Sequence, residues 1–201
     1  MILGSASPRR KELLAALIGE AFEVRTAPDF VEPPCPAVAS LDAVSDFVGD
    51  LAVRKSDAVL AALPETDRGR VLLTADTVVA TEDAPPRVFE KPPEDDRYAA
   101  TVREWLAALS GRWHSVFTGV CVRRGERSES RVVRTRVRFQ PLDDRLIDWY
   151  VATGEPRGKA GGYAIQGQGG LLVNGLDGGF SNVVGLPLGE TRQLLAAFDA
   201  A

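Results

Sequence analysis

The spacing of apolar residues changes along this chain, and it predicts strands that alternate with helices. Residues 70–75 (RVLLTA) form a nearly continuous apolar run, which is typical of a buried central strand. Residues 113–123 and 131–139 predict a pair of strands joined by the polar segment 124–130. The other predicted strands are short: residues 1–4, 22–26 and 87–89.

Helical spacing and capping residues predict the helices between these strands. In the first helix Ser7 is a suitable N-cap, Pro8 takes the first helical position and Gly19 ends the run. The apolar residues between positions 13 and 18 then fall on one face. The predicted helices cover residues 8–18, 41–63, 95–109, 142–151 and 188–198.

Two segments between these elements are irregular by composition. Residues 29–36 carry three prolines and predict a loop, and residues 154–179 are rich in glycine. No repeat or long linker interrupts the chain, so residues 1–201 suit one domain or two closely joined lobes. The alternation of strands and helices predicts an α/β fold with at least one antiparallel pair.

Composition and charge narrow the classes of function. The formal net charge of −4 gives no overall attraction to nucleic acid or to an anionic membrane, so an anion site must be a local basic cluster. Cys35 and Cys121 form no CxxC pair, which argues against zinc and disulfides and fits a reducing cytoplasm. The apolar start is too short for a signal peptide, and no segment is long enough to cross a bilayer. We therefore expect a soluble, cytoplasmic protein.

The turn before the first helix has the character of an anion site. Small residues from Gly4 onward would present backbone N–H groups and a helix N-terminus. Arg9, Arg10 and Lys11 lie in the first helical turn, where each positive charge opposes the helix dipole. A bound anion would reverse that effect. The alternative is a basic helix end exposed to solvent.

Asp76 and Lys91 are further candidates for reactive groups. Asp76 follows an apolar run, so we expect it at the end of a strand, where α/β proteins gather functional side chains. It could hold Mg²⁺ or activate water, or it could be a structural turn residue. Lys91, between a predicted strand and Pro92, could neutralise phosphate, although a surface lysine is the simpler interpretation.

The single histidine and the glycine-rich segment are less specific. His114 has no second histidine and no evident serine or cysteine nucleophile, so a structural or indirect role is favoured. The glycines do not match a Walker loop, because Lys159 is followed by alanine, and they do not match a Rossmann loop either. Gln166 could read the edge of a base, because an amide both donates and accepts hydrogen bonds. The alternative is a flexible surface loop.

Taken together and in order, these segments resemble the Maf family of nucleotide pyrophosphatases. The resemblance implies an elongated mixed sheet with flanking helices and a deep central cleft, similar to inosine-triphosphate pyrophosphatases. It also implies attack of water on the α-phosphorus of a nucleoside triphosphate, release of pyrophosphate, a divalent cation (Mg²⁺ or Mn²⁺) and a possible homodimer. The matching segments, which span positions 3–188, are LGSASPRRKELL, TADTVV, EKP, LSGRWHSVFTGV, GEPRGKAGGYAIQG and SNVVGLPL.

The family resemblance also implies roles for individual residues. Asp76 matches the family's proton acceptor, and the resemblance implies that Asp76 and Glu32 are metal ligands. The residues that would bind substrate are Ser5, Arg9, Arg10, Lys55, Thr77, Lys91 and Gln166. Among them Arg9, Thr77 and Gln166 match the branch that prefers dTTP and UTP.

Two departures from the family pattern affect these expectations. Glu90 stands where many members have glycine, which places a negative charge beside Lys91. The acid-rich loop after the second strand is reduced to Asp29, Glu32 and prolines. Two other functions stay open: a broader pyrophosphatase that removes modified nucleotides, and a nucleotide-binding regulator of cell division with little catalysis. A nucleic-acid-binding module is disfavoured by the acidic charge.

Overall fold

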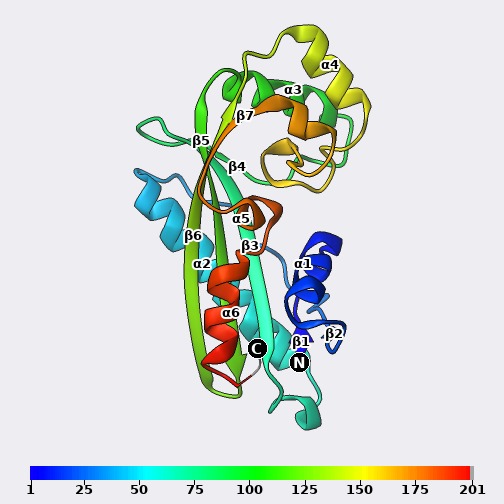
Figure 1. Cartoon of the computed structure of the whole chain (residues 1–201), viewed down its shortest axis with the longest axis vertical. Helices are drawn as coiled ribbons and strands as arrows, with labels where there is room; N and C mark the ends of the chain where they lie inside the picture. Colours follow the sequence, from blue (N-terminus) through cyan, green and yellow to red (C-terminus); the bar gives the residue numbers. More distant parts are fainter. Residues whose placement is uncertain (200–201) are drawn as a thin grey trace.

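A single seven-stranded mixed sheet runs the length of the molecule (Figure 1), in the order β2-β1-β3-β5-β6-β7, with β4 also paired to β3. The computed structural model describes residues 1–199. β1 and β2 are parallel to their neighbours, whereas β3 to β7 pair antiparallel. The strands are β1 (Ile2–Leu3), β2 (Glu23–Val24), β3 (Leu72–Thr81), β4 (Val88–Phe89), β5 (Trp113–Arg124), β6 (Arg127–Phe139) and β7 (Val173–Asp177).

The α-helices cover both faces of this sheet (Figure 1). α2 packs on one face through Val44 and Val48, which contact Val78 and Phe117 of the sheet. The other face carries two separate groups of helices: α1 and α6 toward one end, and α3 and α4 toward the other. The α-helices are α1 (Pro8–Ile18), α2 (Leu41–Ala62), α3 (Tyr98–Leu109), α4 (Asp144–Ala152), α5 (Phe180–Val184) and α6 (Leu188–Ala196), and the 3₁₀ turns are η1 (Glu65–Asp67), η2 (Ala160–Gly162) and η3 (Gln168–Leu172).

The α1 helix begins as the sequence predicts. The Ser7 hydroxyl accepts a hydrogen bond from the Arg10 backbone N–H, Pro8 begins the helix and Gly19 ends it. The helix buries Leu14 against Leu3 and Leu73 of the sheet. Packing of this apolar face fixes the preceding turn at the end of β1.

The predicted ends of several elements were wrong. The polar segment 124–130 mostly belongs to β6, and only a short turn at Gly125 separates β5 from β6. Exposed edges of sheets accept polar side chains, so the polar pattern did not mark the strand. The glycine-rich segment 154–179 contains β7 and η3, and α5 follows it; none of these was predicted. Across residues 1–199, no helix combines the length and apolar character that crossing a membrane requires.

The most important departure concerns β3, which continues to Thr81 and does not end before Asp76. One edge of β3 pairs along its whole length with β5. The other edge pairs with β1 only as far as Leu73 and with β4 only from Val79 onward. Residues 74–78 therefore have no strand neighbour on that edge, and the cleft described below opens there.

Candidate active site

A cleft of about 730 Å³ lies over the uncovered edge of β3. Asp76 and Thr77, consecutive residues of β3 whose side chains point to opposite faces of the sheet, both line it. Every residue that the family resemblance assigned to substrate or metal lines it, from segments far apart in the sequence. These residues are Ser5, Arg9, Arg10, Glu32, Lys55, Asp76, Thr77, Lys91 and Gln166.

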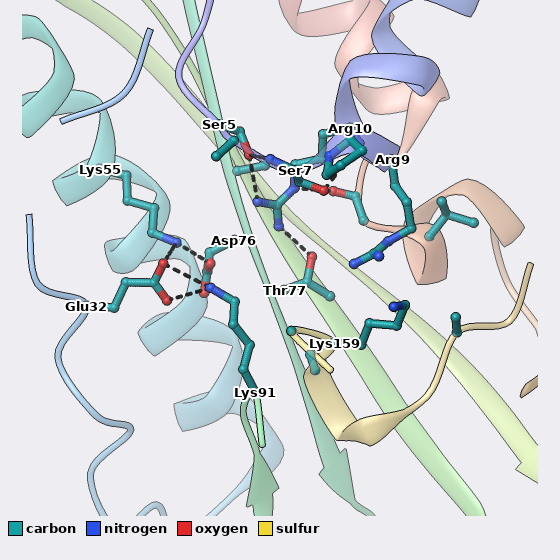
Figure 2. Close-up of a pocket in the computed structure, with 18 of the residues that line it drawn as sticks. Ser5, Ser7, Arg9, Arg10, Glu32, Lys55, Asp76, Thr77, Lys91 and Lys159 are labelled. Carbon is teal, nitrogen blue, oxygen red and sulfur yellow. Dashed lines mark hydrogen bonds and ion pairs between the residues drawn. The ribbon is translucent and has the colours of Figure 1, made fainter. Parts of the chain in front are cut away.

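A row of alternating charges lies along one side of the cleft (Figure 2). Asp76, only 5% exposed, forms an ion pair with Lys55 of α2. The Lys55 Nζ also lies 2.8 Å from Glu32 Oε1, and the same oxygen lies 3.2 Å from Lys91 Nζ. Each carboxylate therefore contacts at least one ammonium group, and the side chains hold one another in place.

Glu32, which lies between Lys55 and Lys91 in this row, stays ionised. Burial alone would raise the pKa of Glu32, but the hydrogen bonds and charges of Lys55 and Lys91 outweigh that effect. The pKa of Glu32 therefore lies below its ordinary value. Glu32 belongs to the proline-rich segment 29–36, which the sequence predicts as an irregular loop. The tertiary fold brings this loop against α2 and β4.

Arg10 forms the centre of a second set of contacts. Its guanidinium donates to the Gly185 carbonyl at 2.8 Å, to Thr77 Oγ1 at 3.0 Å and to Ser5 Oγ at 3.3 Å. Burial lowers the pKa of Arg10, and the charges of Asp76 and Glu32 oppose that shift. These three acceptors come from the turn before α1, the central strand and the end of α5, so Arg10 connects three separate segments that line the cleft.

Arg9 and Lys159 face the cleft from its opposite side (Figure 2). Burial lowers the pKa of both groups, and the charge of Arg9 lowers that of Lys159 further. An anion bound beside Lys159 and Arg9 would offset both the burial and the repulsion that disfavour the protonated form of Lys159. Lys159 and its neighbour Arg157 were missed as binding residues, although both lie in a segment that the resemblance included.

The charge of the cleft is opposite to that of the whole chain. Its basic residues exceed its acidic residues by three, although the chain carries −4 overall. The predicted local basic cluster is therefore present. The basic residues are Arg9, Arg10, Lys55, Lys91, Arg157 and Lys159, and the acidic residues are Glu32, Asp76 and Glu94.

The structure also places the two residues whose roles were uncertain. His114 is fully buried, with its Nε2 2.9 Å from the Tyr163 hydroxyl, and it does not line the cleft. Glu90 directs its carboxylate to the Cys35 backbone N–H at 3.1 Å, and its carbonyl accepts from Gly161 N–H. The unusual Glu90 thus connects β4 to the proline-rich loop.

A family model described as "Maf-like protein" matches residues 1–198. The chain belongs to this family. Among Maf-like relatives, a protein of Anaeromyxobacter sp. (strain Fw109-5) is 48% identical over 97% of this chain and 87% of the relative. A protein of Myxococcus xanthus (strain DK1622) is 46% identical over 97% of this chain and 90% of the relative. A protein of Shewanella oneidensis is 44% identical over 98% of this chain and 96% of the relative. All three relatives bear the name dTTP/UTP pyrophosphatase.

Proposed function

We propose that this chain hydrolyses dTTP and UTP to the nucleoside monophosphate and pyrophosphate. The observation that carries this proposal is the buried Asp76 beside a strongly basic cleft on the uncovered edge of β3. A triphosphate carries about four negative charges, and its hydrolysis depends mainly on positioning and charge neutralisation. The names of the relatives support the choice of nucleotide.

In the proposed reaction Asp76 accepts the proton of a water molecule that attacks the α-phosphorus. Lys55 contacts both Asp76 and Glu32, so it holds the accepting carboxylate in place. Arg9, Arg10 and the basic residues opposite them neutralise the phosphates and the charge on the departing pyrophosphate. The bond from the α-phosphorus to the bridging oxygen breaks, and the oxygen of water takes its place.

We assign the pyrimidine end of the nucleotide to the part of the cleft near Gln166. This side chain is exposed in the segment between η2 and η3 and lines the cleft. Its amide can donate to and accept from the polar edge of a pyrimidine. Thr77, which is held by Arg10 and by Thr118 Oγ1 at 3.0 Å, lines the same cleft.

We also propose a divalent cation, Mg²⁺ or Mn²⁺, held by Asp76 and Glu32. Within residues 1–199 there is no cluster of three or more histidine, cysteine or acidic side chains able to form a complete metal site. Two carboxylates that share one lysine nevertheless fit Mg²⁺, which usually takes one or two carboxylates with substrate phosphates and water. The bound cation would neutralise phosphate charge and polarise the phosphoryl group.

The test is pyrophosphate release by the purified chain with Mg²⁺ or Mn²⁺. We expect rapid turnover of dTTP and UTP and slower turnover of CTP, dATP and 7-methyl-GTP. Asp76→Asn should reduce kcat by at least about 100-fold, because general base catalysis contributes about 10²–10⁴-fold. The matched control is Asp50→Asn, an exposed α2 acid paired with Arg54 at 2.7 Å, which should retain the activity.

The other outcomes separate the alternative functions. Faster turnover of methylated or halogenated pyrimidine nucleotides than of dTTP would identify a pyrophosphatase for modified nucleotides. Tight binding of dTTP without turnover at any metal concentration would overturn the enzymatic proposal and favour a binding regulator. Equal loss of activity in the Asp76 and Asp50 variants would remove the special role of Asp76.

A further inference from the structure

The segment that carries Gln166 is held by a partly buried acid, Glu155, that does not line the cleft. The Glu155 carboxylate accepts hydrogen bonds from Gln168 N–H at 3.0 Å and from Gly169 N–H at 2.8 Å. Its Oε2 also accepts from the Tyr150 hydroxyl at 2.7 Å. These bonds fix the backbone two and three residues after Gln166.

Tyr150 fixes the backbone on the other side of Gln166. Its hydroxyl accepts a hydrogen bond from Ala164 N–H at 3.0 Å while it donates to Glu155. Tyr150 belongs to α4, and its ring is fully buried in the hydrophobic core. The hydroxyl is therefore held at a fixed position. The segment with Gln166 is thus bound at both ends by one connected pair of side chains, which we call the Glu155–Tyr150 clamp.

The charge state of the clamp favours its persistence. Burial would raise the pKa of Glu155, but hydrogen bonds from Tyr150, Gly169 and Gln168 outweigh it, so the pKa lies below its ordinary value. Burial, together with the bond to Glu155, raises the pKa of Tyr150. At neutral pH the acceptor is therefore ionised and the donor keeps its proton.

The glycines of this segment leave the space that the clamp needs. A Cβ on Gly167 would lie 1.9 Å from Glu155 Oε1. A Cβ on Gly169 would lie 2.6 Å from both the Ala164 carbonyl oxygen and the Tyr150 hydroxyl. The close approach of backbone and carboxylate is possible only without these side chains.

We propose that Glu155 and Tyr150 are positioning residues that set the affinity of the cleft for the nucleoside part of its substrate. This inference rests on the proposed function, because it assigns Gln166 to the pyrimidine. Ala164, Ile165 and Gln166 of the held segment line the cleft, so the clamp acts through them. A segment ordered before binding costs less conformational entropy when the base binds.

The experiment compares two ligands that both carry three phosphates, of which only one carries a nucleoside. The probes are a non-hydrolysable α,β-methylene analogue of dTTP and inorganic tripolyphosphate, with binding measured by calorimetry. In Glu155→Gln we expect the analogue to bind about 10-fold or more weakly, because charged hydrogen bonds to the segment are lost. Tripolyphosphate should bind as tightly or more tightly, because the charge of Glu155 also acts on Arg9 and Lys159.

Two further variants separate positioning from general destabilisation. Tyr150→Phe keeps the buried ring and removes only the hydroxyl. It should weaken binding of the analogue but not of tripolyphosphate, and by a smaller factor than Glu155→Gln. Gly167→Ala keeps every charge but forces the segment away from Glu155, and it should reproduce the selective loss. The matched control is Glu129→Gln, a β6 acid paired with Arg127 at 2.7 Å, which should change neither affinity.

In hydrolysis of dTTP, the clamp variants should raise KM by about the same factor by which they lower the affinity for the analogue. Their kcat should stay within about threefold of that of the unmodified chain. Equal weakening of both ligands, or unchanged binding of the analogue in Glu155→Gln and Gly167→Ala, would overturn the positioning role. Because the comparison uses binding, it can be decided even if the chain does not hydrolyse dTTP. A failure of the chain to hydrolyse dTTP would overturn only the proposed function.

Discussion

At the scale of single residues, the cleft contains two different electrostatic environments. On one side, Lys55 and Lys91 are paired with Asp76 and Glu32, so the charges are balanced before any ligand binds. On the other side, Arg9 disfavours the protonated form of Lys159. The first arrangement suits a fixed catalytic carboxylate, and the second suits capture of a polyanion.

The buried His114 leads to a prediction about stability and pH. Burial lowers its pKa from 6.5 to about 3, so the folded chain binds the proton far less readily than the unfolded chain. Stability is therefore lost as the pH falls below about 6.5, where only the unfolded state takes up the proton. Between pH 7.5 and 5.5 the loss through His114 should be about 1.4 kcal/mol.

Urea denaturation at both pH values measures this effect. In His114→Gln the side chain cannot titrate, so the dependence of the free energy of unfolding on pH should be weaker by that amount. An identical pH dependence in the two proteins would show that His114 does not retain its neutral form on folding. The catalytic pH profile should not report His114, because it lies outside the cleft.

At the scale of elements, the close packing of α2 on β5 positions Lys55 beside Asp76. Gly119 of β5 makes this approach possible, because a Cβ there would lie 2.4 Å from the Val48 carbonyl oxygen. Two buried backbones meet at this point, and neither can move without disturbing the sheet or the helix. The contact therefore connects the sheet to the row of charges formed by Asp76, Lys55, Glu32 and Lys91.

Gly119→Ala should lower the free energy of unfolding by about 1–3 kcal/mol, the usual cost of overpacking a core. It should also reduce activity, because α2 and Lys55 must shift away from β3. The control is Gly189→Ala in α6, where a Cβ would meet no atom within 4 Å. That variant should be as stable as the unmodified chain or slightly more stable. Equal effects at the two glycines would contradict this account of the packing.

At the scale of the whole molecule, a basic cleft is set in an acidic protein. Under the proposed function, its surplus of three positive charges attracts a triphosphate against a molecular charge of −4. Such attraction acts over about 10 Å at 0.1 M salt and weakens as salt is added.

The assignment of residues 1–201 to one domain, the homodimer and the cytoplasmic location stay predictions.

The KM for dTTP should therefore rise with ionic strength, by several-fold between about 0.02 and 0.5 M salt, with little change in kcat. Lys159→Gln should weaken this dependence, because it removes a cation of the cleft. Arg131→Gln makes the same change in net charge on the exposed part of β6 and should leave the dependence unchanged. Equal salt dependence in all three proteins would exclude a specific role for the charge of the cleft.

The amino-acid sequence by itself determined the elements with strong local signals. Ser7 and Pro8 marked the start of α1, and apolar spacing located α2 and the long β5 strand. The order of the family motifs also identified residues that line one cleft. Caps, helical spacing and motif residues act locally or are recognised by type, so a single sequence reveals them.

The tertiary structure alone decided how these residues meet. Asp76 belongs to the middle of β3 because β5 pairs with it there, and it is accessible because β1 and β4 leave the other edge uncovered. The contacts of Glu32 with Lys55 and of Glu155 with the segment around Gln166 likewise depend on the packing of separate elements. Strand pairing and edge exposure are set by distant partners, so no local pattern in the sequence contains them.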